Sequence, residues 1–178
     1  MAESKPESWT MGVALSLSVM AVIAGIVTLY MGKYSGRATM LQGQITNQWA
    51  YFQAKSIKQH TYELQKQNLE LQLLVQKPSM TRGAQDQYMK VINDDAVNVS
   101  RYGTEKEDIK KQADEMEAEK QKCQQRSGKL SYALIFLQIS IMLSSVTLIT
   151  KRKQLWYFGM ALSLAGIYFA AIGQFFIK

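Results

Sequence analysis

The chain has 178 residues, of which 47% are hydrophobic and 20% are charged, and it carries a net charge of +7. Its apolar residues are concentrated in three blocks, and the polar stretches between them could not bury a sizeable core, which argues against a soluble globular domain. Basic and acidic residues are mixed along the middle of the chain rather than gathered with aromatic residues, so nucleic-acid binding is not expected.

Three blocks are each long enough to cross a membrane as a helix. They cover residues 9–31, 130–150 and 155–177, and none of them contains Asp, Glu, Lys, Arg or His. Each reaches the ~20 residues that a helix needs to span the hydrocarbon layer. The sequence therefore predicts an all-α membrane protein with three transmembrane helices, an N-terminal tail at 1–8 and a basic loop at 151–154.

The first block is expected to remain in the protein as a helix. Its apolar run is longer than the roughly 7–15 residues of a signal-peptide core, and no convincing small-x-small cleavage site closes it. We therefore interpret residues 9–31 as a transmembrane helix.

Residues 32–129 are expected to form an extramembrane helical hairpin that resembles a coiled coil. The outgoing arm is rich in Gln, Lys, Leu and Ala, which favour helix, and Pro78 ends it. The return arm begins near Gln85, and an interruption is predicted at Gly103. There Thr104 and Glu107 would form a capping box that restarts the helix.

Apolar residues at spacings of three and four draw a thin stripe along both arms. A thin stripe favours an arm that completes its burial against neighbouring copies of the chain, and a solitary two-helix hairpin is the alternative. The stripe contains Leu41, Ile45, Trp49, Phe52, Ile57, Leu64, Leu71 and Leu74 in the first arm, and Ile109, Ala113, Met116 and Cys123 in the second.

Strips of small residues in the first and third spans predict close helix packing. In lipid, small side chains let helix backbones approach each other, and this packing replaces the hydrophobic effect. Packing within one chain and packing between chains both remain open. The strips contain Ala14, Ser18, Ala21, Gly25, Thr28 and Gly32 in the first span, and Gly159, Ser163, Gly166, Ala170 and Gly173 in the third.

The second span is the polar one, and Gln138 is the one strongly polar side chain well inside it. An unsatisfied amide in hydrocarbon costs several kcal/mol, so this side chain is expected to have a partner. An interhelical hydrogen bond is favoured over a bound substrate or ion, because no Asp, Glu, Lys, Arg or His accompanies it in the spans.

No catalytic, cofactor-binding or metal-binding site is predicted, and no enzyme activity is expected. His60 is the only histidine and Cys123 the only cysteine, which excludes a His/Cys metal cluster and a disulfide within the chain. The neighbouring carboxylates Asp94 and Asp95 most resemble a solvated helix face.

Basic residues near the membrane blocks suggest both an orientation and a partner. The short loop 151–154 contains Lys151, Arg152 and Lys153, which places it and the N-terminus in the cytoplasm and the hairpin outside. The basic residues nearest the bilayer are also expected to contact anionic lipid headgroups.

The stretch NQWAYFQAKSIKQ at residues 47–59 resembles the signature NQWAYxQAKSIKQ of a bacterial family catalogued as domain of unknown function 4337. The resemblance extends over most of the chain, since that family has a similar N-terminal span, helical middle and paired C-terminal span with a basic loop. It implies a bacterial inner-membrane protein and carries no activity. Residues that match the signature are candidates for an inter-subunit contact, together with Phe52 of the stripe: Trp49, Tyr51, Gln53, Lys55, Ser56 and Lys58.

Three functional hypotheses follow from these features. The favoured one is a non-enzymatic homo-oligomer that acts as a membrane scaffold. The alternatives are a channel or transporter component whose Ser/Thr-rich second span lines a path, and an accessory subunit of another membrane complex.

Overall fold

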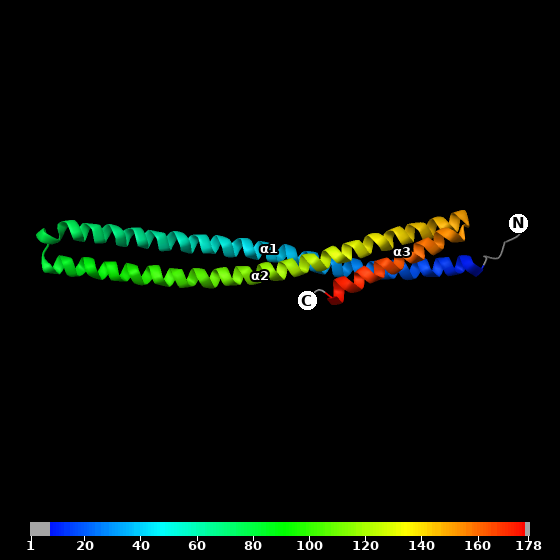
Figure 1. Ribbon diagram of the computed structural model, residues 1–178, viewed down its shortest axis with the longest axis horizontal. Helices are drawn as coiled ribbons and strands as arrows, with labels where there is room; N and C mark the ends of the chain where they lie inside the picture. The colour runs from blue at the N-terminus through cyan, green and yellow to red at the C-terminus, as the bar shows by residue number, and fades with distance from the viewer. Residues whose placement is uncertain (1–7, 177–178) are drawn as a thin grey trace. The chain divides into compact units, whose positions relative to one another are not determined.

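The computed structural model describes the backbone of residues 8–176 and the side chains of residues 9–174, and within these residues it is all-helical. Of the predicted tail and the third predicted span, residues 1–7 and 177 lie outside the described residues. The predicted all-α class is confirmed. The elements in chain order are α1 (Ser8–Gln76), a 3-10 turn (Lys77–Ser79), α2 (Arg82–Thr150), α3 (Lys153–Ala171) and a π-helical turn (Ile172–Phe176) (Figure 1).

Two of the three apolar blocks are not separate helices. Residues 9–31 form the beginning of α1 and residues 130–150 form the end of α2, and each of these helices is 69 residues long. The boundaries drawn at 31 and 130 therefore lie inside continuous helices. All three helices contain a segment that is long and apolar enough to cross a membrane.

The chain divides into two compact units, and the names bundle and hairpin are used for them below. The bundle combines α1 up to Met40 with α2 from Glu119 onward and α3. The hairpin is the continuous segment Leu41–Ala118, in which α1 and α2 run antiparallel on either side of the turn at Pro78.

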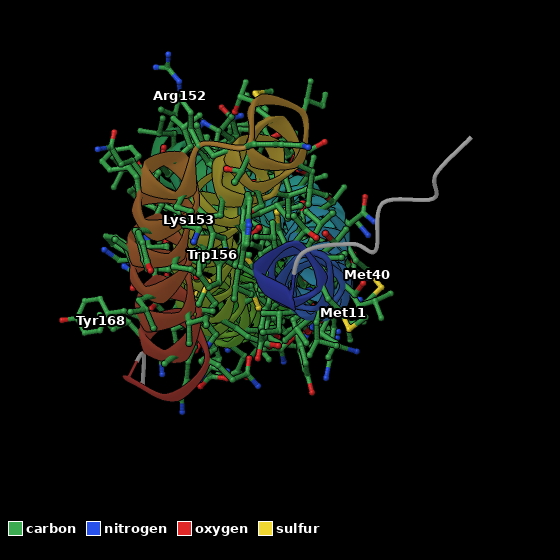
Figure 2. The ribbon with its side chains drawn as sticks, turned by 90° about the vertical axis from the view of Figure 1, so that its right-hand side faces the viewer. Met11, Met40, Arg152, Lys153, Trp156 and Tyr168 are labelled. Carbon is green, nitrogen blue, oxygen red and sulfur yellow. The ribbon has the colours of Figure 1, made fainter. Side chains whose placement is uncertain are left out.

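The bundle is held together along its whole length by contacts between its three helices. Its apolar core joins α1 to α2 through Ala24, Val27, Leu130, Ala133 and Leu137, with Phe169 and Ala170 of α3 packed against them. At the other end, the Trp156 indole donates a hydrogen bond to the Ser16 hydroxyl over 3.2 Å, and the Lys153 ammonium lies 5.4 Å from the centre of the Trp9 ring. Figure 2 shows Lys153 and Trp156 between α3 and α1, with Arg152 pointing away from the helices.

The connection between α2 and α3 consists of Lys151 and Arg152 alone. Lys151 has a φ of 53°, the left-handed conformation that commonly ends a helix, and its N–H donates to the Thr147 carbonyl over 2.9 Å. This single left-handed residue reverses the chain so that α3 packs back along α2.

Contacts in the hairpin follow a seam that keeps alternating spacings of three and four along both helices. Leu41, Ile45 and Phe52 of the predicted stripe lie on this seam, whereas Trp49 is exposed and Gln48 takes its place. The stripe leaves the seam at Ile57, because the step from Phe52 to Ile57 is five residues. The helix keeps its period, so polar residues occupy the seam instead. Its buried and half-buried members are Leu41, Ile45, Gln48, Phe52, Lys55, Gln59, Tyr62, Lys66, Leu69 and Leu73 in α1, and Ile92, Asp95, Val99, Tyr102, Lys106, Ile109, Ala113 and Met116 in α2.

The second half of the predicted stripe is therefore wrong as a contact within the chain. Ile57, Leu64, Leu71 and Leu74 are between 46% and 76% exposed. They form a row of apolar side chains on the outer surface of the hairpin.

The predicted interruption of the return arm at Gly103 is also wrong. The helix α2 is continuous from Arg82 to Thr150, and the Thr104 hydroxyl donates to the Ser100 carbonyl one turn earlier rather than capping a new helix. Gly103 faces α1, where a Cβ atom would lie 3.4 Å from the Gln59 amide nitrogen. The glycine thus admits a polar side chain from the opposite helix without breaking its own.

Candidate functional site

The signature stretch 47–59 lies in the hairpin and carries the most connected polar cluster of the described residues. The Lys55 ammonium forms an ion pair with Glu105 of α2 and lies 5.1 Å and 5.2 Å from the ring centres of Tyr51 and Tyr102. Tyr102 is buried and stacks on Tyr62 of α1, with a centroid distance of 5.7 Å. The stretch therefore fixes how α1 pairs with α2 within one chain.

Two further polar contacts flank this cluster and set the alignment of the two helices. The Gln48 amide donates to the Gln112 carbonyl oxygen over 2.9 Å, and the Lys106 ammonium donates to the Gln59 side chain over 3.0 Å. Polar groups on a seam select one register, because a shifted alignment leaves them without partners.

Each charge of the central ion pair is favoured by its partner. The hydrogen bond with Glu105, supported by Tyr51, holds the pKa of the Lys55 ammonium above its ordinary value. The hydrogen bond from Lys55 holds the pKa of the Glu105 carboxyl below its ordinary value. The pair therefore stabilises the hairpin at every pH between the pKa of the Glu105 carboxyl and the pKa of the Lys55 ammonium, where both groups are charged.

We expect Glu105→Gln to reduce the acid sensitivity of the hairpin. A carboxyl with a lowered native pKa contributes stability that is present above its unfolded pKa and is lost as the pH falls through the native pKa. The melting temperature of the purified protein, followed by circular dichroism between about pH 3 and pH 7, should fall less steeply in the variant. Glu107→Gln, which removes an exposed carboxylate from the same helix, is the control and should behave as the wild type. Equal slopes for all three proteins would contradict the assignment.

The remaining signature residues lie around the seam rather than on it. Trp49 is 37% exposed, with its ring edge-to-face against Phe52 at a centroid distance of 5.5 Å. Tyr51, Gln53 and Lys58 are exposed and Ser56 is half-buried. The structure thus brings Phe52 and Lys55 together with α2, as it does Gln48 and Gln59, and leaves Trp49, Tyr51, Gln53 and Lys58 on the hairpin surface.

The small-residue strip of α3 packs against α2 within the chain. A Cβ atom at Gly166 would lie 3.0 Å from Leu137 Cγ and 3.1 Å from the Ala133 carbonyl oxygen. Gly159, Ser163 and Gly173 are likewise buried, and Ala170 is half-buried. This strip serves the fold of one subunit.

The small-residue strip of α1, in contrast, lies on an exposed surface of the bundle. All six of its residues, including Ala21, are exposed, and a Cβ atom at Gly25 or Gly32 would meet nothing within 4 Å. The hydroxyls of Ser18 and Thr28 donate to carbonyls of their own helix. The strip is therefore a smooth face that no other described part of the chain covers.

The second span presents its polar side chains to two different surroundings. Ser140, Ser144 and Thr147 are fully buried, and the Ser140 hydroxyl donates to the Gly159 carbonyl of α3 over 2.7 Å. Gln138 instead is exposed, and no described residue forms a hydrogen bond with its amide. Ser140, which sequence analysis did not single out, forms the hydrogen bond to α3 that was expected of Gln138.

Two other functional residues escape sequence reasoning. Asp95 is only 3% exposed, and its Oδ2 has no hydrogen-bond partner among the described residues, so the expectation of a solvated face is wrong at this position. Its place on the seam between Ile92 and Val99 explains the burial. Tyr102 could have been found only from the spacing that it shares with Ile109 and Asp95. Within the described residues, no group of three or more His, Cys, Asp or Glu side chains could hold a metal ion.

Comparison with known proteins identifies a family. The sequence model of the family described as domain of unknown function (DUF4337) matches residues 9–176, nearly the whole chain, and confirms the resemblance carried by residues 47–59. No curated protein and no solved structure matches the chain.

Proposed function

The chain belongs to the family described as domain of unknown function (DUF4337), and from that premise we propose that it is a non-enzymatic, homo-oligomeric membrane protein that acts as a scaffold. Its three apolar segments cross the bilayer, and the hairpin stands in the aqueous phase. The bacterial inner membrane is the proposed location, following the family resemblance.

The exposed strip on α1 carries this proposal. Two strips of small residues occur in the bundle, and only the α3 strip packs against another helix of the same chain. Close backbone approach is the main source of helix association in lipid, and a smooth helix face supplies it. A second copy of the chain is the partner that the α1 strip fits.

The exposed Gln138 amide supports association between copies. It lies on an exposed α2 face with Ser145 and the apolar residues Ile135, Met142 and Ile149. A side-chain amide that faces hydrocarbon lacks the hydrogen bonds that water would give it. Contact with another subunit provides a partner for it.

The hairpin also has an unused apolar surface. The row of Ile57, Leu64 and Leu71 repeats every seven residues, which is the period of a coiled-coil seam. Trp49 and Tyr51 add exposed aromatic area on the same unit. A neighbouring hairpin would bury these side chains, as the thin predicted stripe requires.

The mass of the purified protein in nanodiscs, measured by native mass spectrometry, tests the proposal. We expect a discrete assembly of several copies. A monomer under the same conditions would overturn it.

We expect Gln138→Leu to weaken the assembly about tenfold. A hydrogen bond between membrane helices contributes roughly 0.5–2 kcal/mol, so losing it shifts the subunit dissociation constant by about that factor. The constant can be measured by energy transfer between labelled subunits at increasing detergent dilution. Ile135→Leu, which changes the shape of the same face without removing a polar group, should leave it unchanged. An identical constant for Gln138→Leu and wild type would place Gln138 outside any subunit contact.

The alternative of a channel component has less support. Ser140, Ser144 and Thr147 are enclosed between helices of one subunit, so they do not line a path. On the exposed face of this span, the side chains within residues 133–149 that carry an amide or a hydroxyl are Gln138 and Ser145. Ion flux through reconstituted vesicles that is abolished by Gln138→Leu would favour the channel over the scaffold.

For orientation we propose a cytoplasmic N-terminus and 151–154 loop, with the hairpin on the outer side. Lys151, Arg152 and Lys153 in a two-residue turn and the first helical residue form the strongest short-loop basic signal in the chain. Labelling of single cysteines introduced at Arg152 and Lys58 with a membrane-impermeant reagent in intact cells separates the two sides.

A further inference from the structure

A basic cavity opens in the bundle just beyond the apolar blocks of α1 and α2. Its volume is about 470 Å³, within the range of ligand sites. Four cationic side chains line it, and Glu119, its only carboxylate, pairs with Arg37 at 2.9 Å. Its lining residues are Lys33, Tyr34, Arg37, Glu119, Lys122, Cys123 and Arg126.

An excess of positive charge remains in this cavity after the ion pair is formed. Lys33 and Lys122 line it from two helices, and no second carboxylate is among its lining residues. Lysine and arginine side chains held close together near a membrane surface attract a phosphate group strongly.

An apolar groove of about 360 Å³ follows the basic cavity along the same side of the helices. On α1 the lining continues from Ile26 and Tyr30 in the groove to Lys33 and Arg37 in the cavity, at spacings of three and four. On α2 Leu130 lies one turn beyond Arg126, so both helices present one continuous track.

A hydrogen-bond chain joins the two hollows. Arg126 Nη1 donates to the Tyr34 hydroxyl over 3.2 Å, and the hydroxyl donates to Gln174 Oε1 over 3.2 Å. Tyr34 and Arg126 line the cavity, whereas Gln174 lines the groove. The polar end of the site is thereby fixed at the level where the apolar segments end.

We propose that this track is a binding site for a phospholipid with an anionic headgroup. The phosphate is held by Lys33 and Lys122, and an acyl chain lies in the groove between α1 and α3 against Ile26 and Val27. A free anion has no apolar part to bury in the groove. An apolar helix of a second copy would provide no counter-charge for the cationic cavity. A lipid matches both halves at the depth where they occur.

The test is a lipid titration of the full chain, delipidated in detergent and followed by native mass spectrometry. The probes are dioleoyl phosphatidylglycerol, dioleoyl phosphatidylcholine and inorganic phosphate. We expect tight binding of phosphatidylglycerol, weaker binding of phosphatidylcholine, and no competition from inorganic phosphate. Equal binding of the two lipids would overturn the proposal, and competition by phosphate would identify a site for a free anion instead.

Paired variants locate the site on the molecule. The double variant Lys33→Gln/Lys122→Gln should weaken binding of phosphatidylglycerol about 30-fold, since each lysine near a membrane surface strengthens the binding of an anionic headgroup by roughly tenfold or less. Both side chains are exposed, so the bundle should keep its melting temperature. The matched control Lys129→Gln/Lys151→Gln removes the same charge from exposed positions outside the cavity. An equal loss in the control would reduce the effect to general attraction, and a smaller oligomer with unchanged lipid binding would assign the track to a second copy.

Discussion

Gly25→Leu is expected to separate the assembly into smaller species while leaving each subunit folded. The new side chain meets no atom of its own chain within 4 Å of its Cβ, and leucine favours helix over glycine by about 0.8 kcal/mol. Between two closely packed helices the same side chain forces the backbones apart. Overpacking costs ~1–3 kcal/mol, so the subunit dissociation constant should rise about 100-fold.

The measurement is the native mass in nanodiscs at decreasing protein concentration. Gly12→Leu is the matched control, because its Cβ also meets nothing within 4 Å and the residue lies outside the strip. An assembly that withstands Gly25→Leu as well as Gly12→Leu would show that the α1 strip faces lipid rather than another subunit.

The corresponding change on the third helix should instead damage the subunit itself. In Gly166→Leu the first added atom already lies 3.1 Å from the Ala133 carbonyl oxygen and 3.0 Å from Leu137 Cγ, and the rest of the side chain has no space. Since the backbone cannot yield as a flexible side chain does, α3 must move away from α2. We expect a loss of about 3 kcal/mol or more in bundle stability.

Thermal unfolding followed by tryptophan fluorescence reports this change, because the Trp156 indole contacts Ser16 only while α3 is packed. Gly159→Ala provides the graded control. Its Cβ would lie 3.4 Å from the Ser140 carbonyl oxygen, an ordinary contact, and the melting temperature should change little. A wild-type melting temperature for Gly166→Leu would mean that α3 does not pack as described.

Gly25 and Gly166 also show what could not be predicted from the sequence. Both belong to strips of small residues at alternating spacings of three and four, so the pattern predicts close packing for each. Which strip faces the same chain depends on how α2 and α3 turn at Lys151, and that geometry is not written in either strip. The structure separates them by burial alone.

The hairpin gives a different lesson about periodicity. Its existence follows from Pro78 and from helix-favouring composition on both sides, and the structure agrees. In the first arm, apolar residues alone predicted the contact surface correctly at Leu41, Ile45 and Phe52 but not at Trp49, and beyond Phe52 the seam is built from Lys55, Gln59 and Tyr62. Each of these needs a specific partner on α2, and such pairs cannot be recognised from the spacing on one helix.

The two-residue connection between α2 and α3 determines the order in which the helices can pack during synthesis. Helices joined by so short a turn can pack as soon as the second one emerges, since their contacts are close in sequence. The first span must wait for its partner, which is synthesised about 100 residues later, or roughly 5–20 s at ribosomal rates. In the membrane arrangement proposed above, the apolar beginning of α1 is then an isolated helix during that interval, with its small-residue face available to another nascent chain. Copies translated on one messenger RNA would meet first through α1, before either subunit is complete.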